Sequence, residues 1–130
     1  MYPRTRHAHR SFLISATRQA CAVYLKNRVA TSYFVADPAR RHPDQVPIAQ
    51  SDRDALKSSI LRLLAASPSR SITGQLSTTL KTLVAHDFPD RWPSLLLEVK
   101  ALLTSNEIRE VGAGCVATVE VVRAFRSVLS

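Results

Sequence analysis

The sequence contains few glycines and no long apolar run, and both absences narrow the fold classes open to it. Only three glycines occur among 130 residues, beside seven prolines, which argues against a β-sandwich, a collagen-like chain or a glycine-rich phosphate-binding fold. No stretch of about 18 or more apolar residues is present, so the sequence contains no candidate membrane span. The apolar fraction of 45% is nonetheless that of a folded chain the size of one small domain.

Cysteine and histidine are also scarce. Cys21 and Cys115 each lie in a helix-like apolar stretch, which predicts two buried free thiols in a reducing compartment. The four histidines do not stand at ligand spacing, so we expect no metal site. P-loop, GxGxxG and HExxH motifs are absent. The tight ionisable cluster of His86, Asp87 and Asp90 is expected to end one helix and cap the next, so we predict no catalytic residues and no cofactor.

Acidic residues are missing from the first 36 positions, which hold six Lys or Arg side chains and carry most of the formal charge of +8. Residues 1–15 are expected to form a basic, disordered segment. Such a basic end favours an acidic protein surface, nucleic acid or anionic lipid as partner, and its Arg-rich composition also resembles a mitochondrial presequence. Aromatic residues make up only 6% and do not interleave with the basic ones, which argues against a nucleic-acid-binding surface.

The remaining sequence shows helical periodicity with clear interruptions. Apolar residues recur every three to five positions in five segments, which we predict as helices over 16–34, 53–66, 71–86, 91–103 and 108–128. Three prolines, at 38, 43 and 47, predict a loop over residues 35–52. The expected N-caps are Ser51 or Asp52 for the second helix and Asp90 for the fourth.

The last four predicted helices form two antiparallel pairs whose starts are about 38 residues apart. That period is close to the roughly 40–47 residues of HEAT and armadillo units. The sequence therefore predicts an all-α fold, an α-solenoid of HEAT/armadillo-type helical hairpins with about two and a half repeats over residues 16–130. A closed bundle of four or five helices is the alternative architecture.

Two motifs, QACAVYLKNRV at 19–29 and HDFPDRWPSLL at 86–96, resemble the importin-β (karyopherin-β) family of nuclear transport receptors. In that family a helix with a YLKN-like motif closes the first HEAT repeat, and a QL-rich helix leads into a DFPxxWxxLL phrase. Gln75 and Leu76 keep the spacing of the second feature. The proline-containing loop and the segment SITGQLSTTLKTLV are most similar to the importin-seven/importin-eight branch, and the exportin that recycles importin-α is second. The resemblance covers about residues 16–127.

The resemblance implies a binding role rather than an enzymatic one. Receptors of this family bind the GTP-bound form of the small GTPase Ran through the second helices of their first repeats, which here are 16–34, 71–86 and 108–128. Matching positions make up the candidate Ran-binding residues, which are Lys26, Asn27, Arg28, Gln75 and Thr79. Matching positions with an expected structural role are Tyr24, Leu25, Asp87, Phe88, Pro89 and Trp92.

Receptors of this family contain many more repeats, in which most cargo and nucleoporin contacts lie. The sequence is therefore expected to be a truncated fragment, the product of a misplaced gene start or a remnant of a larger receptor, with a helix 16–34 that lacks its usual partner. We expect a protein that shuttles between nucleus and cytoplasm and enters no membrane. The alternatives are a basic helical nucleic-acid-binding or scaffold protein without transport activity, and a helical protein imported into mitochondria.

Overall fold

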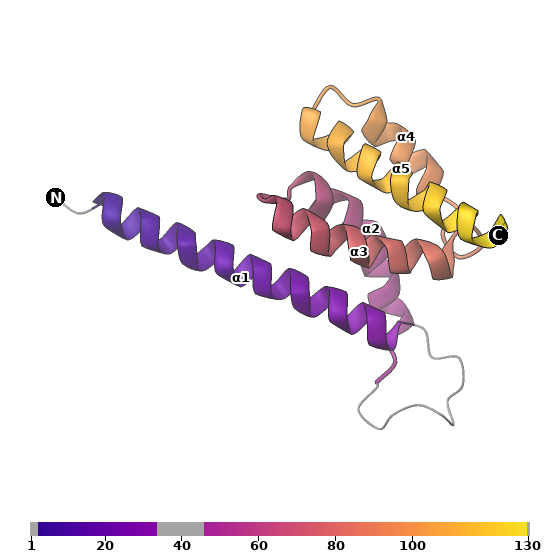
Figure 1. Cartoon of the computed structure of the whole chain (residues 1–130), viewed down its shortest axis with the longest axis horizontal. Helices are drawn as coiled ribbons and strands as arrows, with labels where there is room; N and C mark the ends of the chain where they lie inside the picture. Colours follow the sequence, from indigo (N-terminus) through magenta and orange to yellow (C-terminus); the bar gives the residue numbers. More distant parts are fainter. Residues whose placement is uncertain (1–2, 34–45, 130) are drawn as a thin grey trace.

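The computed structural model describes residues 3–33 and 46–129, with side chains placed at 14–33 and 46–126. These residues form five α-helices and no strand (Figure 1). In chain order the helices are α1 (Pro3–Ser32), α2 (Gln50–Ala65), α3 (Arg70–Asp87), α4 (Leu95–Leu103) and α5 (Ile108–Leu129). The all-α prediction is confirmed.

The helices stack as hairpins rather than closing into a bundle. α2 packs on α3 and α4 packs on α5, while α5 also contacts both helices of the preceding hairpin. α1 packs along α3, and its backbone approaches none of the other described helices closely. Figure 1 shows α1, α3 and α5 as successive members of one layer, with α2 and α4 behind them. This arrangement is a fragment of a HEAT-like α-solenoid.

One continuous apolar core joins the helices from α1 to α5. Its largest fully buried apolar side chains come from the predicted stripes, and they are Tyr33, Ile60, Leu80, Leu83 and Leu95. Gly114 allows the close approach of α4 and α5, because a Cβ atom at this position would lie 3.0 Å from the side chain of Leu103. Gly112 and Gly114 both lie within the regular helix α5, although glycine weakens a helix in isolation.

α1 is longer than the sequence analysis indicated. It begins at Pro3 and spans 30 residues, so residues 3–15 are helical rather than disordered, and the helix does not start at residue 16. Proline suits the first position of a helix, because its missing N–H would have no partner there. No glycine or further proline interrupts the segment up to Ser32. Most of the predicted loop lies outside the described residues, although its end is helical because α2 begins at Gln50.

The predicted N-caps of α2 and α4 are wrong. Ala49 occupies the N-cap position of α2, without a side-chain hydrogen bond. α4 begins at Leu95 rather than at residue 91, so Asp90 lies in the preceding turns and Ser94 takes the N-cap position. Pro93 explains why α4 begins later in the sequence than predicted, because a proline disfavours helical geometry at the residue before it. The hydroxyl of Ser94 donates to Glu98, one turn into the helix.

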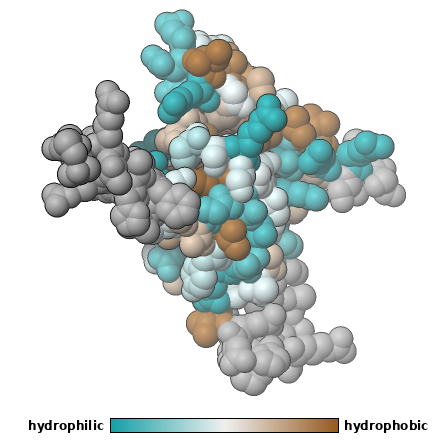
Figure 2. Space-filling model, turned by 60° about the vertical axis from the view of Figure 1, so that its left-hand side comes forward, coloured by the Kyte–Doolittle hydropathy of each residue, from teal (hydrophilic) through white to brown (hydrophobic). Residues whose placement is uncertain are grey.

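Several apolar and sulfur-containing side chains reach the surface. Cys21 and Cys115 are free but exposed, contrary to the prediction, because each lies one or two positions away from the buried alanines of its helix. Figure 2 shows hydrophobic surface at the top of the molecule, over the turn between α4 and α5, where Leu103 and Ile108 are exposed. None of the described helices is long and apolar enough to span a bilayer.

Candidate functional site

A buried polar cluster, here called the Asp87 junction, joins α1, α2 and α3. Asp87 is the last residue of α3 and is 3% exposed. Its carboxylate accepts a hydrogen bond from the hydroxyl of Tyr33 and lies 3.0 Å from Nζ of Lys57. Lys57 also donates to the carbonyl of Arg91 at 3.0 Å, and the guanidinium of Arg53 lies 4.6 Å from the centroid of the Tyr33 ring. The junction thus links three helices and the turn after α3.

The charges in the junction compensate one another. A buried carboxylate or ammonium group is costly unless it is paired and hydrogen-bonded, and here each has at least two partners. Burial raises the pKa of Tyr33 above its ordinary value of 10.0, and the hydrogen bond to Asp87 and the negative charge of that carboxylate raise it further. Arg53 opposes this effect through its positive charge. Tyr33 therefore stays protonated and serves as a donor.

Tyr33→Phe is expected to lower the free energy of unfolding near neutral pH by about 1.5–3 kcal/mol, the range for a hydrogen bond to a charged group. Because folding raises the pKa of Tyr33, its contribution is fully present below about pH 10 and is lost as the pH rises further. Urea unfolding at about pH 8 and pH 10.5 should show that the free energy of unfolding falls more between these pH values for the native chain than for the variant. Tyr24→Phe, at an exposed tyrosine, is the control, and equal slopes for the native chain and Tyr33→Phe would contradict this account.

The turn between α3 and α4 is fixed by the tryptophan of the DFPxxWxxLL phrase. Trp92 is 3% exposed, and its indole N–H donates to Glu98 Oε2 at 3.0 Å. Phe88 is half-buried and packs edge-on against Phe125 of α5, with ring centroids 5.4 Å apart. Pro89 is exposed and follows a cis peptide bond. These positions lie in or beside the bend between the two hairpins.

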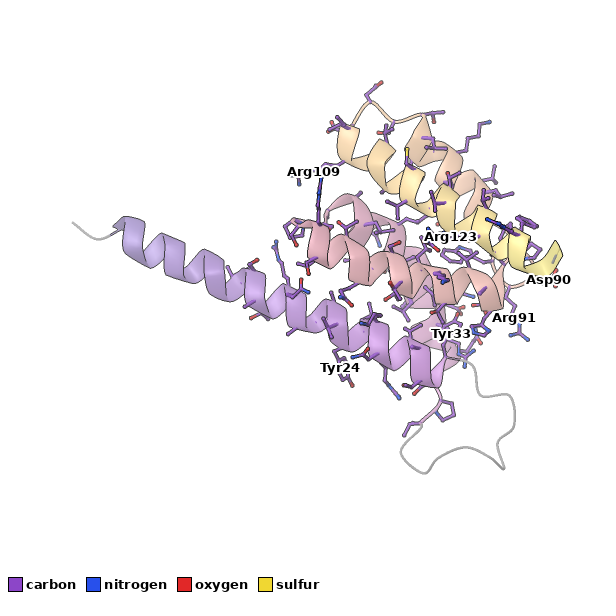
Figure 3. The ribbon with its side chains drawn as sticks, in the orientation of Figure 1. Tyr24, Tyr33, Asp90, Arg91, Arg109 and Arg123 are labelled. Carbon is purple, nitrogen blue, oxygen red and sulfur yellow. The ribbon has the colours of Figure 1, made fainter. Side chains whose placement is uncertain are left out.

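The YLKN motif lies on α1 and divides between core and surface. Leu25 packs against the core, whereas Tyr24 is 70% exposed and points away from the other helices (Figure 3). The expected structural role of Tyr24 is therefore not seen among the described residues. Lys26 is half-buried and Asn27 is exposed. Arg28 is half-buried, and its guanidinium donates to Ser32 Oγ at 2.7 Å.

The two candidate binding residues of α3 have different surroundings. Gln75 is half-buried, and its Oε1 has no hydrogen-bond partner among the described groups. Thr79 is fully buried, and its hydroxyl donates to the carbonyl of Gln75 at 3.0 Å. Thr79, expected from the resemblance to be a Ran-binding residue, therefore has no surface to offer a partner in this structure. Threonine occurs here in the core because its hydroxyl bonds within its own helix.

Sequence reasoning missed a polar contact between α3 and α5. Ser77 donates to Glu120 Oε1 at 3.2 Å, and Arg123 lies 3.2 Å from the same oxygen. Glu120 is 4% exposed, whereas the Arg123 side chain is largely exposed (Figure 3). Isolated polar residues at such spacing give no recognisable motif. Ser77 and Glu120 each lie next to buried apolar positions of their helices, and this was the signal in the sequence that could have suggested a contact between α3 and α5.

Across side chains 14–33 and 46–126, no three His, Cys, Asp or Glu residues lie close enough together to hold a metal ion. Of the ionisable residues predicted as a cluster at 86–90, Asp87 packs within the junction, whereas His86 and Asp90 are exposed.

Comparisons with known proteins place the chain among transport receptors. It is 26% identical to a probable importin-7 homolog of Dictyostelium discoideum over 111 residues, which cover 85% of this chain and 10% of that protein. It is 33% identical to human importin-8 over 68% of this chain and 8% of that protein, and 35% identical to Xenopus laevis exportin-2 over 60% and 7%. The chain spans about a tenth of the length of these curated relatives.

Two further comparisons gave no match. No protein-family model matches the chain, and no solved structure matches it. The assignment therefore rests on the named relatives together with the stacked helical hairpins. The chain belongs to the importin-β family of nuclear transport receptors.

Proposed function

We propose that this region binds the GTP-bound form of Ran through α1, α3 and α5 and so takes part in protein transport between nucleus and cytoplasm. The observation that carries the proposal is the shared layer of these three helices, in which α3 and α5 are the second helices of their hairpins (Figure 1). Cargo proteins and nucleoporins would be partners of the longer receptors. The proposal assigns only the Ran contact to the region in hand.

The charge of this layer supports an acidic partner. Basic side chains with exposed surface occur on all three helices, and they include Arg18, Lys26, Lys81, Arg123 and Arg126. The described part of α1 contains no acidic residue. The acidic groups of the other two helices are engaged, because Asp87 and Glu120 are buried and Glu110 accepts a hydrogen bond from Ser105. The layer is therefore cationic, and it complements acidic patches on a partner.

Binding of this kind requires no chemistry by the chain itself. A receptor responds to the nucleotide state of a GTPase through a difference in affinity between the two states. The proposed contacts are half-buried Lys26 and exposed Asn27 on α1 and half-buried Gln75 on α3.

Lys26→Glu is expected to weaken binding to Ran loaded with a GTP analogue by about three- to tenfold, because it reverses a charge on the cationic layer. Binding measured at two salt concentrations should show a smaller salt dependence for this variant. Lys100→Glu, an exposed change on α4 outside the layer, is the matched control and should bind as the native chain does. Equal affinity of the native chain for the GTP and GDP forms would contradict the proposal.

The alternative function, nucleic-acid binding, draws on the same cationic layer and the formal charge of +8. It predicts tight binding to RNA or DNA with a steep loss of affinity as salt rises. Such binding, persisting after deletion of residues 1–12 and without any preference for a Ran nucleotide state, would favour this alternative.

A further inference from the structure

Two hollows between α1 and α2 together form a groove that no described segment fills. The first, of about 400 Å³, lies between α1 and the turn that follows α2, and the second, of about 580 Å³, lies between α1 and the start of α2. Leu25 lines both hollows. We call this the α1–α2 groove, with Cys21, Leu25 and Val29 on one wall, Leu56 and Leu63 on the other, and Ile72 on its floor.

The dimensions of the groove suit a helix. Its α1 wall runs from Thr17 to Val29, which corresponds to about 18 Å or three turns at 1.5 Å per residue. The groove separates α1 from α2, whose backbones make no close contact. Leu63 is 44% exposed on the α2 wall, so apolar surface is available to an occupant. Amphipathic helices bind grooves of this kind through apolar residues spaced three and four positions apart.

The charges around the groove specify the occupant further. Arg18 and Arg28 stand toward opposite ends of the α1 wall, and this wall contains no acidic residue. Among the residues that the structure describes, Asp52 on the opposite wall is the one carboxylate that lines either hollow, and it lies in the second hollow with Arg28. The end near Arg18 therefore presents a positive charge beside an apolar floor. An occupant would gain from carboxylates on the flank that faces α1.

We propose that the α1–α2 groove binds an amphipathic helix supplied by another polypeptide, with carboxylates on the flank that faces α1. The apolar face of that helix packs between Leu25 and Leu63, and one of its carboxylates pairs with Arg18. The groove differs from the proposed Ran-binding layer in its second wall, which belongs to α2, whereas Arg18 of α1 belongs to both. The occupant is recognised by shape and charge together.

Two synthetic helical peptides of about 18 residues test this proposal with the full chain. Both carry the same apolar face, and one has Glu where the other has Lys along the flank. We expect the Glu peptide to bind about tenfold more tightly by fluorescence anisotropy and to slow modification of the Cys21 thiol. Cys115 is exposed on α5, outside the groove, so its modification rate should not change.

Substitutions separate groove binding from attraction by overall charge. Leu63→Glu should lower the affinity for the Glu peptide by about tenfold or more, because it places a charge on the apolar wall. Leu97→Glu, at a 71% exposed leucine on α4, is the matched control and should bind normally. Arg18→Glu should remove the preference for the Glu peptide. Equal binding of the two peptides, or binding without protection of Cys21, would overturn the proposal.

A second copy of the chain is the competing occupant. In that case Cys21 would become protected as the protein concentration rises, with no peptide present. That result would also overturn the proposal, because the groove would then be an interface between copies.

Discussion

Trp92→Ala is expected to lower the free energy of unfolding by about 3–5 kcal/mol, the usual cost of truncating a buried tryptophan. Its side chain is 3% exposed within the core, and the indole N–H donates to Glu98 at the start of α4. Removal leaves a cavity between the hairpins, and Glu98 Oε2 keeps the hydroxyl of Ser94 as a donor. Because small domains are stable by only about 5–15 kcal/mol, the variant should be largely unfolded at mild urea concentrations.

Circular dichroism during urea unfolding measures this effect. Trp92→Phe is the matched control, because it keeps most of the apolar volume and loses the hydrogen bond to the Glu98 carboxylate, at an expected cost of about 1.5–3 kcal/mol for that bond. A melting temperature that is the same for Trp92→Ala and the native chain would show that Trp92 does not hold the hairpins together.

Asp87→Ala is expected to cost a similar amount, about 3–5 kcal/mol, because it leaves one member of a buried ion pair without its partner. Lys57 is 8% exposed and would keep only the carbonyl of Arg91 as a close buried acceptor, while the hydroxyl of Tyr33 would lose its acceptor. Urea unfolding of the variant at neutral pH measures the loss. α1 should be the first element to separate, because Tyr33 links it to α3.

A combined variant distinguishes pairing from simple sensitivity to substitution. Asp87→Leu with Lys57→Met and Tyr33→Phe removes every polar partner together and should recover most of the stability lost in Asp87→Ala, as apolar replacements of buried ion pairs often do. If the combined variant is no more stable than Asp87→Ala, the compensation inferred for the junction is incorrect.

The helical spacing of apolar residues and the positions of the prolines explain how much of the fold could be predicted. The apolar stripes of α2, α3 and α5 follow a helical period, and their expected core positions, such as Ile60 and Leu80, are buried. Pro68, after α2, and Pro89, after α3, follow the predicted helix ends. Helix starts were less predictable, because Ser51, Asp52 and Asp90 are all good N-caps in principle and local geometry favoured other positions.

Contacts between distant residues explain what could not be predicted. Tyr33 and Asp87 are 54 positions apart, and nothing local in the sequence indicates that they meet. Lys57 lies next to the apolar stripe of α2, which is weak evidence of burial for a lysine. Thr79 was expected at the surface as a Ran-binding residue but is buried, because a threonine whose hydroxyl bonds within its own helix can replace an apolar residue in the core. Such partners follow from packing rather than from residue type.

The central claim is that α1, α3 and α5 form the face that binds Ran. Hydrogen–deuterium exchange of the chain, alone and saturated with Ran carrying a GTP analogue, tests it most directly. We predict slower exchange at exposed positions of α1, α3 and α5, little change in α2 and α4, and a weaker effect with Ran·GDP. Protection confined to α2 and α4, or no protection at saturating Ran, would contradict the account.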